Sequence, residues 1–227
     1  MRYPDHIYII RGHHEDIAIN SVHGLAEECE KRLDDNVRSE NSIFMKLNAL
    51  FELLPLAVLI DNKVLCVHGG IGNSVSKLSD IASVRRPIQV VHDVHTTEQQ
   101  ILMDLLWSEY SEDINEVAIN EERDITKSGF ILKYGKDKLN KFLSDNKLSL
   151  LITSHQWISE GVRSFNNDKL LTVFSATNYA DKHNNIAGML NVTKVPIQII
   201  PKLIDVYKTD KKNYSSAKNL SPVRKNK

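Results

Sequence analysis

Four histidines share one kind of position, just after a short apolar run. They are His13, His14, His68 and His155. Imidazole is the commonest protein ligand for transition metals, and it also exchanges a proton near neutral pH. These residue types at these places therefore predict either a metal site or an acid–base site. Their spacing alone leaves both alternatives open.

Three apolar runs must position these histidines, and their residue types suit strands. The predicted strands are Ile7–Ile10, Val64–Val67 and Leu148–Ile152. β-branched and aromatic side chains pack well on a pleated, buried surface. Because sites of α/β proteins gather at the carboxyl ends of strands, we expect the four histidines to converge there. The remaining histidines are interpreted as ordinary surface or structural residues, and they are His6, His23, His92, His95 and His183.

Helical patterns occupy several connecting segments. Apolar residues at mixed three- and four-residue spacing predict a helix over Asp16–Leu33. Its predicted buried stripe is Ile17, Val22, Leu25, Cys29 and Leu33. Ser42 is a predicted helix cap, and Asp137–Leu143 is a predicted helix whose inward residues are Leu139, Phe142 and Leu143. Gln89–Gln100 is predicted to be a loop, and Val195–Ile204 an edge strand because it contains prolines.

Composition limits the class of protein. The chain has 227 residues, a formal net charge of zero and 41% hydrophobic residues, enough for one domain with a substantial core. Zero net charge argues against a general nucleic-acid binder, and no apolar run approaches the ~20 residues of a membrane span. The cysteines, Cys29 and Cys66, lack metal-type spacing and favour a reducing, intracellular compartment. We expect a domain over residues 1–205 and a basic, disordered tail over residues 206–227.

Five short motifs carry a family resemblance. They are RGHHE at Arg11–Glu15, HGGIG at His68–Gly72, MDLLWSE at Met103–Glu109, TSHQ at Thr153–Gln156 and FSATNY at Phe174–Tyr179. With these motifs in this order, the chain resembles the PPP family of metal-dependent protein serine/threonine phosphatases, which are calcineurin-like metallophosphoesterases. Among them it looks most like the kelch-repeat phosphatases. The resemblance implies a mixed α/β fold in which helices flank a β-sandwich core.

The resemblance also implies roles for single residues. The implied metal ligands are His13, His68 and His155, and the complete domain would hold two divalent ions, manganese or iron and zinc. His14 would protonate the leaving serine or threonine oxygen as general acid. Tyr179 would line the cleft, and Arg11 would form a salt bridge at the strand end.

The sequence departs from the family pattern at several points. His13 replaces an asparagine ligand, and Lys127 or Ser128, depending on the alignment, replaces a phosphate-binding arginine. A lysine keeps the charge but loses the bidentate fork of an arginine. Thr153 stands where the family usually has an arginine. The motifs GDxHG and GDxVDRG, which carry the other metal ligands in the family, do not occur in the sequence, so we expect an N-terminally incomplete catalytic domain. Such a chain is either part of a longer polypeptide, the product of a wrongly placed gene start, or a degenerate protein.

Two functions are compatible with these features. We expect a protein serine/threonine phosphatase that uses two metal ions, this chain being the C-terminal part of its catalytic domain and close to inactive alone. The alternative is a non-catalytic, phosphatase-like binding module. The expected partners are a phosphoprotein substrate and regulatory or kelch-repeat segments outside this chain, with no nucleic acid and no membrane. A cytoplasmic location is expected, and the basic tail leaves a nuclear location open.

Overall fold

The computed structural model describes residues 3–91, 93–124, 127–194 and 197–205, so the predicted tail lies outside the described residues. The described chain forms two compact units. The first unit comprises the residues up to Val58 together with Val67–Asn146, and the second comprises Leu59–Cys66 and the residues from Lys147 onward. Among the helices of the described residues, none has the length and apolar character needed to cross a membrane.

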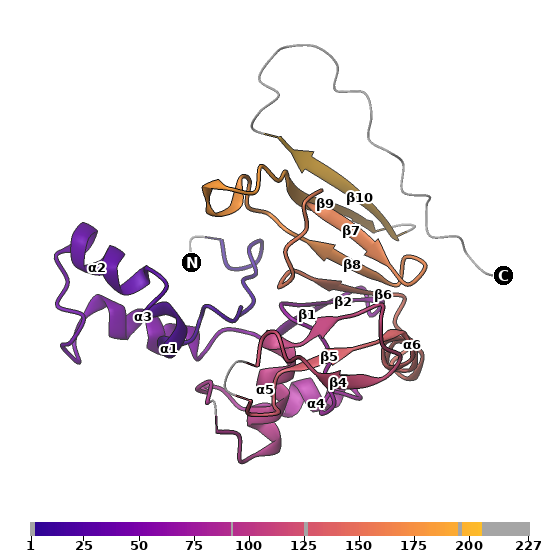
Figure 1. Cartoon of the computed structure of the whole chain (residues 1–227), viewed down its shortest axis with the longest axis horizontal. Coiled ribbons are helices and arrows are strands. Elements are labelled where there is room, and N and C mark those ends of the chain that lie inside the picture. The colour runs from indigo at the N-terminus through magenta and orange to yellow at the C-terminus, as the bar shows by residue number, and fades with distance from the viewer. Residues whose placement is uncertain (1–2, 92, 125–126, 195–196, 206–227) are drawn as a thin grey trace, which may run out of the picture. The chain divides into compact units, whose positions relative to one another are not determined.

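The first unit holds the helices and a small sheet (Figure 1). Its helices are α1 (Ile17–Asn20), α2 (Leu25–Leu33), α3 (Ile43–Phe51), α4 (Leu78–Ser83), α5 (Thr97–Trp107) and α6 (Lys136–Asp145). Its sheet has the order β3-β5-β4, with β3 (Glu109–Tyr110), β4 (Val117–Ile119) and β5 (Leu132–Tyr134). The helix predicted over Asp137–Leu143 is confirmed as α6, and its predicted inward residues are buried.

The second unit is built mostly from strands (Figure 1), and these form two sheets that pack together as two layers. A five-stranded sheet has the order β1-β2-β6-β8-β7. Its strands are β1 (Ala57–Ile60), β2 (Val64–Val67), β6 (Leu150–Thr153), β7 (Val162–Phe165) and β8 (Leu170–Val173). A hairpin of β9 (Ala187–Lys194) and β10 (Ile197–Ile204) forms a separate antiparallel pair, and a 3-10 turn, η1, spans Tyr179–Asp181.

The core of the second unit lies between these two layers. Val64, Leu150 and Leu171 are buried on the five-stranded sheet. The hairpin contributes Leu190, Ile197 and Ile199, which pack against them. Burying apolar side chains from two sheets in one core stabilises a layered arrangement. Together with the helices of the first unit, this confirms the predicted mixed α/β class.

The strand predicted over Ile7–Ile10 is wrong for the described residues. The segment has no strand structure, and Ile7, Tyr8 and Ile9 are 48%, 72% and 49% exposed. Their residue types suit a strand, but a strand exists only where a neighbouring edge accepts its hydrogen bonds. The main-chain bond from Arg11 to the carbonyl of Pro55 comes only after the apolar run has ended.

The helix predicted over Asp16–Leu33 is two helices, and most of its predicted buried stripe is exposed. Gly24 interrupts it in the left-handed region at φ 103°, which glycine adopts at little cost. Val22 is 74% exposed and Leu33 52% exposed, whereas Cys29 is buried. The spacing was correct for an amphipathic helix, but no described element covers most of that face.

Two helix starts show how capping decides an element. Ser42 is confirmed as the cap of α3, because its hydroxyl accepts a bond from the amide of Met45. The loop predicted over Gln89–Gln100 is wrong at its end, since α5 begins there. Thr96 and Gln99 form a capping box that starts the helix four residues before its apolar run.

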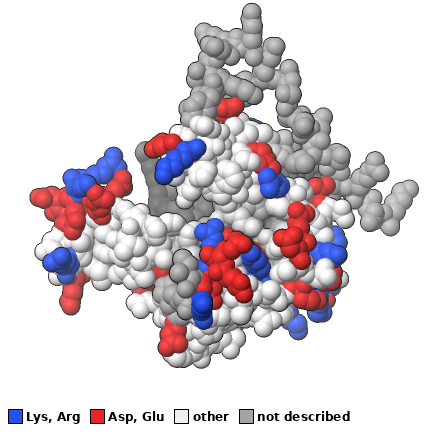
Figure 2. Space-filling model, in the orientation of Figure 1, with Lys and Arg blue, Asp and Glu red and all other residues white. Residues whose placement is uncertain are grey.

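Charged side chains of both signs are mixed on the visible face of the molecule in Figure 2. This mixture accords with the formal net charge of zero.

Candidate active site

Two histidines that are 55 positions apart in the sequence meet in the first unit. His13 lies in the turn after Gly12, and His68 follows β2 directly. The Nδ1 atom of His13 lies 2.6 Å from the Nε2 atom of His68, and their ring centroids are 4.9 Å apart. Both residues are half-buried, so the pair is partly shielded from water.

This pair has the protonation state that a metal ligand needs. Burial, followed by the neighbouring histidines, lowers the pKa of His13 to about 3. Burial and the nearby His14 lower the pKa of His68 to about 4. Both imidazoles are therefore neutral at pH 7, the form that binds metal. Two nitrogens on one ion lie about 3.0–3.4 Å apart, so the pair would need to open by less than about 1 Å.

The turn that carries His13 is held by hydrogen bonds between side chains and main-chain groups. The amide of Gly12 donates to the carboxylate of Glu15 at 2.7 Å. Arg11 is only 2% exposed, and its guanidinium donates to the carbonyl oxygens of Glu15 and Ile88. Within the described residues, these bonds to carbonyl oxygens take the place of the predicted salt bridge.

Gly12 also explains how the two histidines come so close. A Cβ atom added at Gly12 would lie 2.7 Å from Glu15 Oε2 and 3.1 Å from His68 Nδ1. Ordinary carbon contacts are longer than this, so a side chain would push on the His68 ring. The small residue at this position therefore lets the His68 ring pack directly against the turn.

His14 lies beside this pair on the solvent side. Its ring is exposed, 4.4 Å from the ring of His13 and 5.5 Å from that of His23. Its carbonyl accepts a bond from the side chain of Asn20 at 3.2 Å. An exposed imidazole next to a cluster of donors can exchange a proton with a ligand from solvent. The contact with His23, interpreted from the sequence as an ordinary residue, was not predicted.

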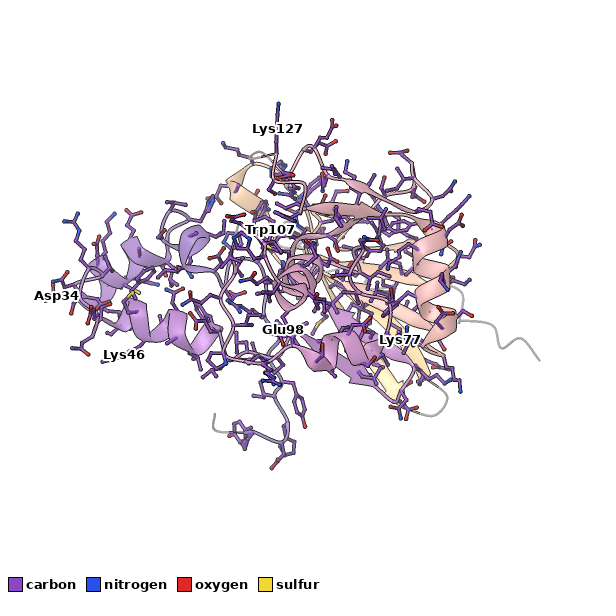
Figure 3. All side chains as sticks on the ribbon, turned by 90° about the horizontal axis from the view of Figure 1, so that it is seen from below. Asp34, Lys46, Lys77, Glu98, Trp107 and Lys127 are labelled. Carbon is purple, nitrogen blue, oxygen red and sulfur yellow. The ribbon has the colours of Figure 1, made fainter. Side chains whose placement is uncertain are left out.

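Helix α5 supports the loop that follows His68. The amide of Gly69 donates to the carbonyl of Leu105 at 2.7 Å, and the ring of Trp107 lies 4.7 Å from that of His13. Figure 3 shows Trp107 among the side chains at the centre of the view. Asp104 is buried and accepts bonds from the amide and hydroxyl of Ser74. Burial raises the pKa of Asp104, while the bonds from Ser74 lower it.

The glycines of the HGGIG motif make this close approach possible. A Cβ atom at Gly69 would lie 2.7 Å from the carbonyl carbon of Leu106. At Gly72 it would lie 2.1 Å from Asp104 Oδ1. The loop with the HGGIG motif therefore packs directly against the segment with the MDLLWSE motif, and this contact holds His68 in place.

His155 and Tyr179 belong to the second unit. His155 follows β6 after one intervening residue and is 7% exposed. Thr153, the last residue of β6, is buried, and its hydroxyl pairs with that of Thr172 on β8 at 3.0 Å. Tyr179 begins η1 and is 46% exposed.

Comparison with known proteins identifies the family. Residues 1–158 match the family model described as calcineurin-like phosphoesterase. The chain belongs to this family. The histidine-bearing turns described above are thus the candidate active site of a calcineurin-like phosphoesterase.

Two relatives of this phosphoesterase are informative. Serine/threonine-protein phosphatase BSL2 of Arabidopsis thaliana is 33% identical over 204 residues, which are 90% of this chain and 19% of that protein. A protein serine/threonine phosphatase from Saccharomyces cerevisiae, with similarity to human phosphatase PP5, superposes with a TM-score of 0.73 at 28% identity. That match covers 92% of this chain and 63% of the yeast chain. The phosphoesterase described here therefore spans less than two thirds of either relative.

A cation near the phosphoesterase site was missed in the sequence. Arg123 donates to the carboxylate of Glu109 at 3.0 Å, and its charge contributes to lowering the pKa of His13. Lys127 has a positive φ of 54°, and Figure 3 shows its side chain extending outward. Arg123 stands four residues before Lys127, so an alignment that allows a longer loop before β5 could have found it.

Proposed function

We propose that this chain is the C-terminal part of a serine/threonine phosphatase catalytic domain that hydrolyses phosphoserine and phosphothreonine in proteins. The observation that carries the proposal is the 2.6 Å approach of His13 and His68, with His14 exposed beside them. Membership of the calcineurin-like phosphoesterase family and the names of both relatives support the same activity.

The metal ligands in this proposal are His13, His68 and His155. The parallel register of β2 and β6 supports the inclusion of His155, because Cys66 is level with Ile152. Parallel strands end at the same sheet edge, and one of these histidines follows each strand. Nitrogen donors suit manganese, iron or zinc. A bound divalent ion would neutralise phosphate charge and lower the pKa of a water molecule.

Other side chains would bind the substrate and move a proton. His14 would donate its proton to the leaving serine or threonine oxygen. Tyr179 would line the cleft. We assign the phosphate-binding cation to Arg123 in preference to Lys127, since Arg123 acts electrostatically on His13 and offers a planar fork of donors.

Metal binding by the 227-residue chain gives the first test. Titration calorimetry with Mn²⁺ should show a site that His68→Ala and His155→Ala each weaken at least about tenfold, because each variant removes a ligand nitrogen. The matched control is His6→Ala, an exposed histidine in the first unit. Unchanged Mn²⁺ affinity in both ligand variants would refute the assigned site.

Phosphate release from a phosphothreonine peptide gives the second test. The chain alone should turn over almost nothing, and a longer polypeptide carrying the GDxHG and GDxVDRG motifs upstream should be active. His14→Ala and Arg123→Gln should each cost that activity about a hundredfold or more, and Lys127→Gln should cost little. Phosphopeptide binding without turnover in the longer polypeptide would favour the non-catalytic binding module.

The proposed partners are a phosphoprotein substrate and regulatory or kelch-repeat segments outside this chain. The free thiols of Cys29 and Cys66 support a reducing compartment, and we propose the cytoplasm or the nucleus.

A further inference from the structure

Three aromatic rings form an exposed row in the second unit, and none of them is a metal ligand or a proton donor in the proposed reaction. Trp157 and Tyr179 are 43% and 46% exposed, and His183 is exposed between them. The ring centroids of Trp157 and His183 are 5.1 Å apart, and those of His183 and Tyr179 are 6.1 Å apart with the rings stacked. Exposed aromatic rings of this size are unusual unless something covers them in use.

The row is held by a tied loop. The side chain of Asn185 is buried and donates to the carbonyl oxygens of Ala176 and Ile186, and it accepts from the amide of Tyr179 at 2.8 Å. The amide of Ile186 donates to the carbonyl of Ser159, which ties this loop to the segment that carries Trp157. The rings are therefore fixed before any ligand arrives, and pre-organised rings bind with a smaller loss of conformational entropy.

The row lies next to the proposed chemistry along the chain. Trp157 follows the proposed metal ligand His155 by two residues, a reach of at most about 7 Å in extended chain. Tyr179 is the proposed cleft-lining residue. A peptide whose phosphorylated residue reached the proposed ligand His155 could therefore place a neighbouring residue against the row.

The charges around the row favour an uncharged partner. Glu160 and Arg163 pair with each other, and Asp181 and Lys182 carry opposite signs next to His183. The charges of these four described residues therefore cancel and favour neither a cation nor an anion. Flat aromatic surfaces then recognise proline or another ring by stacking and apolar burial.

We propose that Trp157, His183 and Tyr179 select phosphoprotein substrates in which a ring-bearing residue, proline or an aromatic, adjoins the phosphorylated serine or threonine. The proposal rests on the proposed phosphatase function for the identity of the phosphorylated residue. It adds a specificity-determining surface that acts through the neighbouring residue.

Peptide binding by fluorescence polarisation tests the row separately from turnover. Four labelled peptides combine threonine or phosphothreonine with proline or alanine at the next position, and a second set replaces proline by phenylalanine. The 227-residue chain with Mn²⁺ should bind the ring-bearing phosphopeptides about threefold to tenfold more tightly than their alanine partners. Trp157→Ala and His183→Ala should each reduce this ratio towards one. The control Tyr8→Ala, an exposed aromatic residue of the first unit, should leave it unchanged.

Each outcome decides one of the two proposals. If the unmodified chain binds ring-bearing and alanine peptides with equal affinity, the proposed selection by the aromatic row is wrong. It is also wrong if the ratio of the two affinities is unchanged in both Trp157→Ala and His183→Ala. A third outcome is a preference for ring-bearing peptides in which phosphorylated and unphosphorylated forms bind with equal affinity. That result would support the aromatic row and count against the phosphatase function. Circular dichroism of the variants checks that they fold, and the second variant keeps the test decisive if one does not.

Discussion

Replacing Gly12 by alanine should disturb the histidine pair without removing any histidine. The added methyl group would lie 2.7 Å from Glu15 Oε2 and 3.1–3.2 Å from two atoms of the His68 ring. The carboxylate end of Glu15 can swing away, but it then loses its bond from the Gly12 amide. The His68 ring must move by a few tenths of an ångström, which also disturbs its contact with His13.

The size of the effect follows from these two changes. Losing a hydrogen bond to a carboxylate costs about 1.5–3 kcal/mol, and an off-rotamer histidine costs about 0.5–1.5 kcal/mol. Alanine recovers about 0.4–1 kcal/mol by restricting the unfolded chain. The free energy of unfolding should therefore fall by about 1–4 kcal/mol, which lowers the melting temperature by about 2–16 °C for a chain of this length. Displacing a ligand side chain should weaken Mn²⁺ binding about tenfold to a hundredfold.

Thermal unfolding by circular dichroism and Mn²⁺ titration calorimetry measure the two effects. The matched control is Gly24→Ala, where a Cβ atom meets nothing within 4 Å but φ is 103°. That control should lose about 1 kcal/mol through backbone strain and keep its Mn²⁺ affinity. If Gly12→Ala has the same melting temperature and the same Mn²⁺ affinity as the unmodified chain, the close approach of the turn to His68 does not constrain the site.

Two further substitutions test the packing and the electrostatics. Tyr134 is fully buried, and its hydroxyl has no hydrogen-bond partner among the described residues. Tyr134→Phe should therefore raise the free energy of unfolding, measured by urea titration, by about 1 kcal/mol. A loss of stability in this variant would contradict the prediction. The bond from Arg163 lowers the pKa of Glu160 to about 2. A lowered pKa stabilises the fold above the ordinary carboxylate pKa, and this contribution disappears as pH falls to about 2. Both side chains are more than 40% exposed, so Glu160→Gln should cost less than about 1 kcal/mol at pH 7. A difference that grows in acid would argue against the pair.

Several elements could be predicted because their signals are local. Strand β2 and helix α6 each follow from the residue types of one short contiguous run, and one face of the helix consists of leucine and phenylalanine. The family could be predicted for the same reason, because each of its motifs is a short contiguous run and their order can be read along the chain. The early start of α5 also has a local signal, which is the capping box of Thr96 and Gln99.

Other predictions failed because a pattern describes one surface and not its neighbour. Ile7–Ile9 have residue types that suit a strand, and Val22 lies in a helical pattern, yet these side chains are exposed because no described element packs on them. Burial depends on a partner surface that comes from elsewhere, and residue types in the run cannot report it.

The sequence by itself determined which functional groups are present. It contains imidazoles after apolar runs, glycines beside them, and motifs in the order that is typical of the family. Only the tertiary structure decided which groups meet. It brought ring nitrogens of His13 and His68 to 2.6 Å across 55 positions, and it placed Arg123 where its charge acts on His13. It also brought the ring centroid of Trp157 to 5.1 Å from that of His183. The physical reason is range, since capping and periodicity act over a few residues. Contacts and pKa shifts depend on the burial and charges that distant segments supply.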